Sequence, residues 1–585
     1  MEFFIPTVLT SMSLTVSFVL NNALVGNLLG PYYMAGLNVI SPFFQLYSAI
    51  SILFGIGASS LMAIAKGERN NVYSNKIFTA AMAAILAISI LLTILQYFFI
   101  DDILAMLTKN EAIAVYAKEY YRYMFWGTPF YLILLTIAFC LRLDGRAKLS
   151  SIILITCSAI SVGLNFILIK FFGFTLDGAG IAMVTGYFAG MLLLIPYAFS
   201  KTRSIHFDFS FFHNISGVLK HIWEIVKYGF PAALGVTLIM LKIFAINHIT
   251  DNIDVSCGIV IFTVCISCWS FVSMFIAGSA QTMIPILGTL YGEHDFKGVR
   301  GVFWLTLKVM LFFCMLCVLY ANFFTEDILM CFGVDAGQIL HKGIPAVRIF
   351  SVSLLGTAVS FLFLYYYTTI GKRTLSILIS LCEGFLIIIP LAYILGELFG
   401  LTGVWYSFIL CEILTVIIIY IYTWIGDHRK GDNCFYGIMQ IPKQATGELI
   451  NVSLNCTFHN AADVSAHIQK DLLRNGIDEV SAYKAALIIE CTVINISSFN
   501  KKRKDINIDI RLCSQNGKIE IFIRDNGALI TPIAYSGDNN DDYLLDKITH
   551  EKLYENISGM RLVELLSCKI EHNWMLGLNY ITIIV

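Results

Sequence analysis

Three ionisable side chains interrupt long apolar stretches of this chain: Lys242, Glu383 and Glu412. A charge inside a bilayer is expensive, so such residues usually pair with one another or mark a path for ions or solutes. Lys242 and Glu383 could instead extend to opposite membrane surfaces. The alternative pairs Lys242 with an acid, so that its ammonium takes the place of a transported cation. At about 1.5 Å per helical residue, Lys242 and Glu412 share the outer half of the membrane and Glu383 lies nearer the inner half, which makes Glu412 the predicted partner.

The elements that carry these residues are predicted to be membrane helices. The chain has 585 residues, of which 57% are hydrophobic and 14% charged. About twelve apolar segments of spanning length, roughly 20 residues each, can be placed before Trp424. The net charge of −1 argues against nucleic acid as a partner. The 15 cysteines are scattered among apolar residues, which favours buried thiols and predicts no metal site.

Lysine and arginine are concentrated in alternate loops, as in the stretch with Lys66, Arg69 and Lys76, whereas the intervening loops hold acids such as Asp101 and Asp102. Basic loops face the cytoplasm. We therefore expect a multi-pass protein of a bacterial plasma membrane, with both termini on the cytoplasmic side.

The membrane region is a duplication. Gly67-Glu68 recurs 225 residues later as Gly292-Glu293, and Phe172-Gly173 recurs 227 residues later as Phe399-Gly400. Each copy holds about six spans and begins on the same side, so the repeats are parallel. We expect residues 1–425 to form two six-helix bundles, an N-lobe (1–200) and a C-lobe (223–425). Secondary transporters are commonly built this way, with the substrate site between the halves.

Several motifs resemble those of multidrug and toxin extrusion (MATE) transporters. They are Val25-Gly26-x-x-x-Gly30, Phe54-Gly55-x-Gly57-Ala58-Ser59, Leu143-Asp144-Gly145, Leu164-Asn165, Asp177-Gly178-Ala179-Gly180, Gly229-Phe230-Pro231-Ala232 and Ala280-Gln281-x-x-x-Pro285. The resemblance implies alternating access between two bundles and export of small organic solutes, cations among them, against inward Na⁺ or H⁺. It also implies transport roles for Asn165 and Gln281.

The chain departs from this family in its first helix. Many members have an aspartate just before the Val-Gly pair, whereas this chain has Asn21-Asn22. An amide does not titrate, so a protonation switch at Asn21 is excluded, although its carbonyl oxygen can still ligate Na⁺ or a hydroxyl group. The charges needed for coupling are therefore expected in the C-lobe, at Lys242, Glu383 and Glu412.

Residues 426–445 have the composition of a linker, and residues 446–585 read as a separate α/β sandwich. Residues 506–512 and 519–523 alternate as half-buried strands, with a hairpin signal at Asn516-Gly517 between them. Helices are expected over 462–475 and 481–498, and the chain closes with a strand over 580–585.

This domain resembles the gyrase and histidine-kinase type ATPases (HATPase), in the version found in anti-sigma-factor serine kinases. Asp525-Asn526-Gly527 resembles the adenine box, and Gly559-Met560-Arg561 a glycine box. The resemblance implies a Bergerat-type fold that binds ATP, with Mg²⁺, in which Asp525, Gly527 and Gly559 are the cofactor-binding residues and Glu490 is the candidate catalytic residue for phosphoryl transfer.

Some of the residues with which that family binds Mg²⁺ and phosphate are replaced in this chain. The family places an asparagine four residues after the glutamate, where this chain has Ile494, and Asn495 points about 100° away. Ile557 replaces a permissive glycine. The Mg²⁺ ligand is predicted to be lost, so serine kinase activity is the weaker expectation and a protein-docking scaffold the alternative.

Two functions remain open from the sequence. The first is a MATE-like exporter with a regulatory ATP-binding domain. The second is a membrane sensor whose kinase-like domain binds or regulates a partner protein inside the cell. The intact duplication favours export, and the missing acid beside Asn21 favours signalling.

Overall fold

The computed structural model describes residues 4–30, 33, 36–37, 39–107, 111–200, 203–208, 215–254, 258–332, 338–429, 437–442, 448–455, 458–500, 506–515, 518–528 and 562–585. The chain divides into two compact units, Met1–Ile441 and Pro442–Val585. The division falls inside the predicted linker. Each unit is described by itself.

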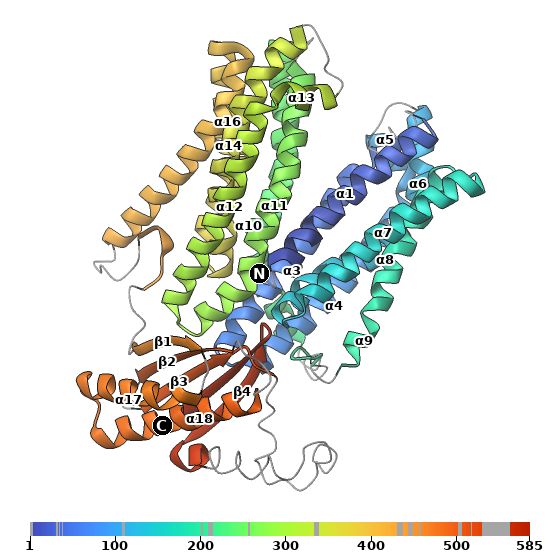
Figure 1. The fold of residues 1–585 in the computed structure, drawn as a ribbon. Helices are drawn as coiled ribbons and strands as arrows, with labels where there is room; N and C mark the ends of the chain where they lie inside the picture. Colours follow the sequence, from blue (N-terminus) through green and yellow to red (C-terminus); the bar gives the residue numbers. More distant parts are fainter. Residues whose placement is uncertain are drawn as a thin grey trace. The chain divides into compact units, whose positions relative to one another are not determined.

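The first half of the membrane unit is a bundle of long helices (Figure 1). They are α1 (Phe4–Leu28), α3 (Ser41–Gly67), α4 (Asn71–Phe98), α6 (Glu111–Leu143), α7 (Ala147–Phe172) and α8 (Leu176–Leu193). Two short helices, α5 (Ile100–Leu107) and α9 (Ile195–Ala198), accompany them. Within this bundle α7 packs on α1 and α8, and α6 packs on α4 and α8.

The second half repeats the arrangement. Its helices are α10 (Ile215–Ile253), α11 (Gly258–Gly292), α12 (Phe296–Phe323), α13 (Thr325–Cys331), α14 (Gln338–Thr369), α15 (Arg373–Leu381) and α16 (Ile388–Arg429). A π-helical turn, η2 (Cys382–Leu386), joins α15 to α16. The short helices α5 and α13 occupy equivalent places in the two repeats, and neither was expected from hydropathy.

Helix α16 contains the end of one predicted span and the whole of the next. Gly400 has φ 65° and ψ −151° and breaks α16, separating the expected spans 375–396 and 402–424. Its repeat equivalent Gly173 has φ 68° and ends α7. Only glycine adopts this backbone readily, so the repeated Phe-Gly pairs mark equivalent helix breaks.

Among the described residues, eleven helical stretches are long and apolar enough to cross a membrane, one of them in the second unit at Glu479–Phe499. The stretch Arg373–Ile425 includes both spans around Gly400, and α1 adds a shorter apolar part, Val16–Leu28. The predicted all-helical membrane region is confirmed.

The two halves meet through α3, which packs on α10 and α11, and through α1, which packs on α11. The contact is close enough to require glycine. A Cβ added to Gly229 would lie 1.8 Å from the carbonyl oxygen of Leu53. The repeat-related Gly67 and Gly292 also face each other, since a Cβ on Gly67 would lie 2.9 Å from the Cα of Gly292.

The second unit is a five-stranded antiparallel sheet with two helices (Figure 1). The strands are β1 (Glu448–Asn455), β2 (Asn507–Gln515), β3 (Lys518–Asp525), β4 (Lys569–Met575) and β5 (Leu578–Ile584), in the order β1-β2-β3-β5-β4. Helices α17 (Phe458–Arg474) and α18 (Glu479–Phe499) share an apolar core with the sheet. The pairing of Gln515 with Lys518 agrees with the expected hairpin. The edge strands β1 and β4 were not expected.

The glycine contact between the halves leads to a prediction. Gly229→Ala should lower the thermal midpoint of the purified protein, because the added methyl group overpacks α10 against α3 at a cost of about 1–3 kcal/mol. Gly163→Ala is the matched control, because nothing lies within 4 Å of a Cβ there. It gains the same helix propensity without the clash and should be neutral or stabilising. Equal midpoints for the two variants would refute the close contact.

Candidate functional site

The three ionisable residues of the C-lobe come together from three elements: Lys242 from α10, Glu383 from η2 and Glu412 from α16. Each acid interacts electrostatically with Lys242, and Glu383 also with Glu412. The Lys242 side chain is 9% exposed, and its Nζ lies 5.3 Å from the ring centre of Trp269 and 6.0 Å from that of Phe408. Among the described residues, Lys242 forms no ion pair within 4.0 Å. The group of three is called the C-lobe triad below.

Glu412 is held as a double hydrogen-bond acceptor. Thr357 Oγ1 donates to its Oε1 at 2.8 Å, and Ser360 Oγ donates to its Oε2 at 2.7 Å. Both hydroxyls come from α14. Gly356 makes room for the carboxylate, because a Cβ there would lie 2.4 Å from the Cβ of Glu412.

Glu383 lies in the π-helical turn, and its Oε1 is buried without a hydrogen-bond partner. Ser360 lies close to this carboxyl as well. Counting residues along an ideal helix put Glu383 at a different depth from Lys242 and Glu412. The structure instead groups all three, and η2 and the break at Gly400 lie between Glu383 and Glu412, where ideal-helix counting fails.

The corresponding polar group of the N-lobe is uncharged. Asn165 Nδ2 on α7 donates to Asn21 Oδ1 on α1 at 2.8 Å. The Oδ1 atoms of Asn165 and of Asn22 are buried without a hydrogen-bond partner. The structure thus brings together the two predicted amides, and it leaves two further carbonyl oxygens able to accept a donor or ligate a cation.

Gln281 links the two halves. Arg142 Nη1, at the end of α6, donates to Gln281 Oε1 on α11 at 3.2 Å, and Tyr365 on α14 is a further neighbour of Gln281. The Arg142 side chain is 4% exposed and its guanidinium lies 4.9 Å from the ring centre of Phe139. Its position beside the Leu143-Asp144-Gly145 motif was the available signal in the sequence for this role.

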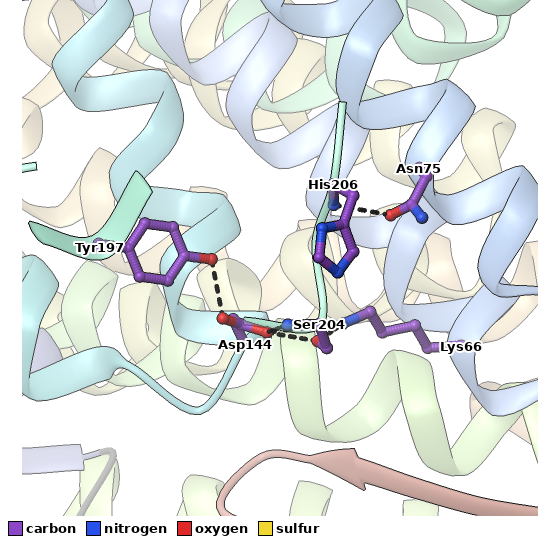
Figure 2. A network of polar contacts seen from close by, with 6 residues as sticks. All are labelled: Lys66, Asn75, Asp144, Tyr197, Ser204 and His206. Carbon is purple, nitrogen blue, oxygen red and sulfur yellow. Dashed lines mark hydrogen bonds and ion pairs between the residues drawn. The ribbon is translucent and has the colours of Figure 1, made fainter. Parts of the chain in front are cut away.

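A second buried network ties the segment 203–208 to the first bundle (Figure 2). Asp144 Oδ1 accepts from the backbone N of Ser204 at 2.8 Å, and Oδ2 accepts from the Tyr197 hydroxyl at 2.7 Å. Lys66 Nζ lies 3.9 Å from Oδ1 and donates to the Ser204 hydroxyl. The segment is further held where Asn75 Oδ1 accepts from the backbone N of His206. Because 203–208 leads into the second bundle, this network fixes the start of the connection to the first.

In the second unit, Asp525 ends β3 and is buried. Its Oδ1 accepts from Gly527 N at 2.8 Å and from Asn579 Nδ2 at 2.9 Å, while Oδ2 has no partner among the described residues. Burial raises the pKa of this carboxyl above its ordinary value, and the two hydrogen bonds oppose that shift. A Cβ on Gly527 would lie 2.6 Å from Asn500 Nδ2. Asp525 Oδ2 is therefore a buried oxygen that can accept a hydrogen bond from a ligand.

The residues predicted to lie near the ATP phosphates are only partly described by the structure. Glu490 is half-buried on α18, and Gly559 lies outside the described residues. Asn495 is buried, and neither atom of its amide has a partner. Within the described part of the chain no group of three or more His, Cys, Asp or Glu side chains is arranged to hold a metal ion.

Two repeated bundles of apolar helices, each with a buried polar group, define a duplicated multi-pass membrane transporter. Residues 6–167 and 231–394 match the family model MatE, and the chain belongs to this family. The two matched ranges fall in the two repeats. The second unit lies outside both.

Relatives support the same assignment. The chain is 24% identical over 439 residues to the multidrug export protein MepA of Staphylococcus haemolyticus, covering 72% of this chain and 92% of the relative. It is 23% identical to MepA of Staphylococcus saprophyticus, over 72% and 93% of the two chains.

Solved structures show the same fold. One is an outward-facing multidrug resistance MATE family transporter of the MOP superfamily, with a TM-score of 0.68, 20% identity and coverage of 74% of this chain and 96% of that one. Another is a MOP superfamily transporter from Pyrococcus furiosus, with a TM-score of 0.68 at 19% identity and the same coverage.

The Asp144 network leads to the second prediction. Asp144→Ala leaves the buried Lys66 ammonium without its counter-charge, so the variant should lose about 3–5 kcal/mol of stability. It should also free the segment 203–208, so that trypsin cleaves after Arg203 faster than in the wild type. Asp101→Ala, which removes an exposed pair with Lys118, is the control and should digest like the wild type. Unchanged digestion of both variants would show that Asp144 does not hold the segment.

Proposed function

We propose that the chain exports organic solutes in exchange for Na⁺ or H⁺ and that its second unit binds ATP as a regulatory domain. The observation that carries the export proposal is the C-lobe triad, a buried set of one ammonium and two carboxyl groups inside a repeated transporter bundle. Buried ionisable groups at membrane depth belong to ion or substrate pathways.

The coupling charge is assigned to the C-lobe because the central polar pair of the N-lobe carries none. Its central pair, Asn21 and Asn165, contains two amides that keep the same charge at every pH. An antiporter needs a group whose charge or ligation changes between the two half-cycles. Among the predicted transport residues, only those of the triad can do this by titration.

The nature of the solute is inferred from relatives and from the charge of the triad. MepA is named a multidrug export protein, and this supports an organic solute. When both acids are ionised the triad has one more negative than positive charge, so a cationic solute is the class it would attract. The aromatic rings of Trp269 and Phe408 beside Lys242 already accommodate one cation.

ATP binding is proposed from the free oxygen of Asp525. Leaving a buried acceptor unpaired costs about 1–3 kcal/mol, and the adenine amino group is the donor that the Bergerat-type ATPases would supply. Gly527 keeps the Asp525 carboxyl uncrowded, because a Cβ there would lie 2.7 Å from its Oδ1. A regulatory rather than catalytic role for ATP follows, because Ile494 stands where those ATPases have the asparagine that holds Mg²⁺ near Glu490.

The coupling role of Lys242 has a direct test. Lys242→Ala should change or abolish the dependence of transport on Na⁺ and pH gradients, because the resident positive charge is lost. The measurement is ethidium accumulation in inverted membrane vesicles under imposed gradients. Lys170→Ala, at an exposed position on α7, is the control and should keep the wild-type dependence. Unaltered ion dependence in Lys242→Ala would reject the pairing. If the chain never alters accumulation while deletion of 440–585 changes gene expression, signalling is its function.

ATP binding is tested on the full-length protein by calorimetric titration with ATP and Mg²⁺. Asp525→Ala should weaken binding roughly tenfold or more, because a hydrogen bond to a charged acceptor contributes about 1.5–3 kcal/mol. Asp463→Ala, at an exposed site on α17, should bind like the wild type. Absence of binding by the wild type would leave the second unit as a docking scaffold.

A further inference from the structure

We propose that Arg142 is a recognition site for a carboxylate group on the exported solute. This inference rests on the export function proposed above and names the chemical class of its solutes, organic cations that also carry a carboxylate. The assignment comes from the burial of the Arg142 guanidinium, its contacts and its lack of a counter-charge.

The Arg142 guanidinium is a buried charge with no acid beside it. The side chain is 4% exposed, and among the described residues it forms no ion pair. The ionisable group that acts on it electrostatically is Tyr365, which is neutral. Asp144, the nearest acid in the sequence, is already engaged by Lys66 and Ser204. Because an uncompensated buried charge is costly, the missing negative charge is expected to come from a ligand.

The guanidinium also has donors that the protein does not use. Its Nη1 donates to Gln281 Oε1 at 3.2 Å, whereas its Nε is buried without a partner in the described part of the chain. A guanidinium presents five N–H donors in a planar fork, which matches the two oxygens of a carboxylate. One amide oxygen satisfies only one of these donors, so the fork remains able to bind a charged acceptor.

The site lies where the two halves of the transporter meet. The guanidinium is 4.9 Å from the ring centre of Phe139, and Gly55 on α3 makes room for that ring, since a Cβ there would lie 2.4 Å from its Cδ2. These three residues belong to the first half, whereas Gln281 and Tyr365 come from α11 and α14 of the second. Gln281 is itself partly exposed. Exchange across the membrane requires the halves to separate on one side at a time, and separation here would part Gln281 from Arg142.

Gln281 and the solute carboxylate can therefore alternate on the same guanidinium. While the halves are in contact, the neutral amide oxygen accepts one hydrogen bond. When they separate, the guanidinium loses this acceptor and a carboxylate can take its place. A neutral residue suits position 281, because a carboxylate there would bind Arg142 about twice as strongly and compete with the solute.

A site of opposite charge lies further along α14. Tyr365 is five residues from Ser360, which donates to Glu412 of the C-lobe triad, so the two positions are about 7.5 Å apart along the helix axis. The triad has one more negative than positive charge when both acids are ionised, whereas Arg142 is positive. A solute with a cationic group and a carboxylate would find a counter-charge for each.

The test compares two dyes that differ at the carboxylate. Rhodamine B has a cationic xanthene ring and a free carboxylate, and in its ethyl ester the carboxylate is blocked. Binding of each dye to the purified full-length protein is measured by fluorescence anisotropy at neutral pH. The wild type should bind the acid about tenfold or more tightly than the ester, as expected for a hydrogen bond between charged groups. Arg142→Gln should abolish this preference.

Three further variants complete the design. Gln281→Glu should also abolish the preference although Arg142 is kept, because the new carboxylate occupies the guanidinium. Arg142→Lys should keep part of the preference, since the charge remains without the planar fork. Arg122→Gln, at an exposed site on the same helix, is the control and should keep the wild-type ratio.

A wild type without preference for the acid, or a preference that survives Arg142→Gln, would overturn the proposal. Should Arg142→Gln fail to fold, survival of the preference in Gln281→Glu has the same consequence.

Accumulation of the two dyes in inverted membrane vesicles separates this inference from the export proposal. If the binding preference depends on Arg142 and neither dye is transported, the carboxylate site stands and export fails. If both dyes are transported and no variant changes the ratio of acid to ester, export stands and the assignment of Arg142 is wrong.

Discussion

A charge that is buried in a membrane protein must be neutralised where it lies, and this constraint organises the second bundle. Lys242 cannot reach water easily, so two acids are brought to it from other elements. The hydroxyls of Thr357 and Ser360 then hold Glu412, and Gly356 removes the methyl group that would displace it. The π-helical turn sets the position of Glu383. Each of these features is costly or unusual alone, and each is explained by the lysine.

The two halves of the duplication differ in how they accommodate polar side chains between their helices. The first bundle pairs amides, Asn21 with Asn165, and avoids buried charge between these helices. The second keeps charge and balances it. The halves still share the devices that fix helix ends, since Gly173 and Gly400 adopt nearly the same left-handed backbone. Divergence has therefore affected the polar interiors more than the scaffold that positions them.

The features that could be predicted from the sequence are those encoded by periodic hydropathy, by repeats or by neighbouring residues. Spans, the duplication and the strand hairpin follow from hydropathy, repeats and turn residues, so the membrane region and strands β2, β3 and β5 were predictable. The edge strands β1 and β4 were missed, and β4 has few apolar residues. The meeting of Glu383 with Lys242 was not predictable either, because an ideal helix was assumed across η2 and Gly400.

The partners of Arg142 and Asp144 could not be predicted for a different reason. Both lie next to a helix end whose motif was visible, but their contacts, Gln281 and Ser204, are distant in the sequence. Only the packing of α6 against its neighbours brings them together. A motif can indicate that a position matters before the fold shows what it touches.

Helix α14 connects the charged site with the end of the membrane unit. It carries Ser360, which donates to Glu412, and about 9 Å further along it carries Tyr366. The Tyr366 hydroxyl donates to the carbonyl of Met439 at 2.8 Å, and Tyr367 donates to that of Ile438. These carbonyls belong to the last residues before the second unit begins at Pro442. A displacement of α14 would therefore reach residues 438 and 439 directly through these two hydrogen bonds.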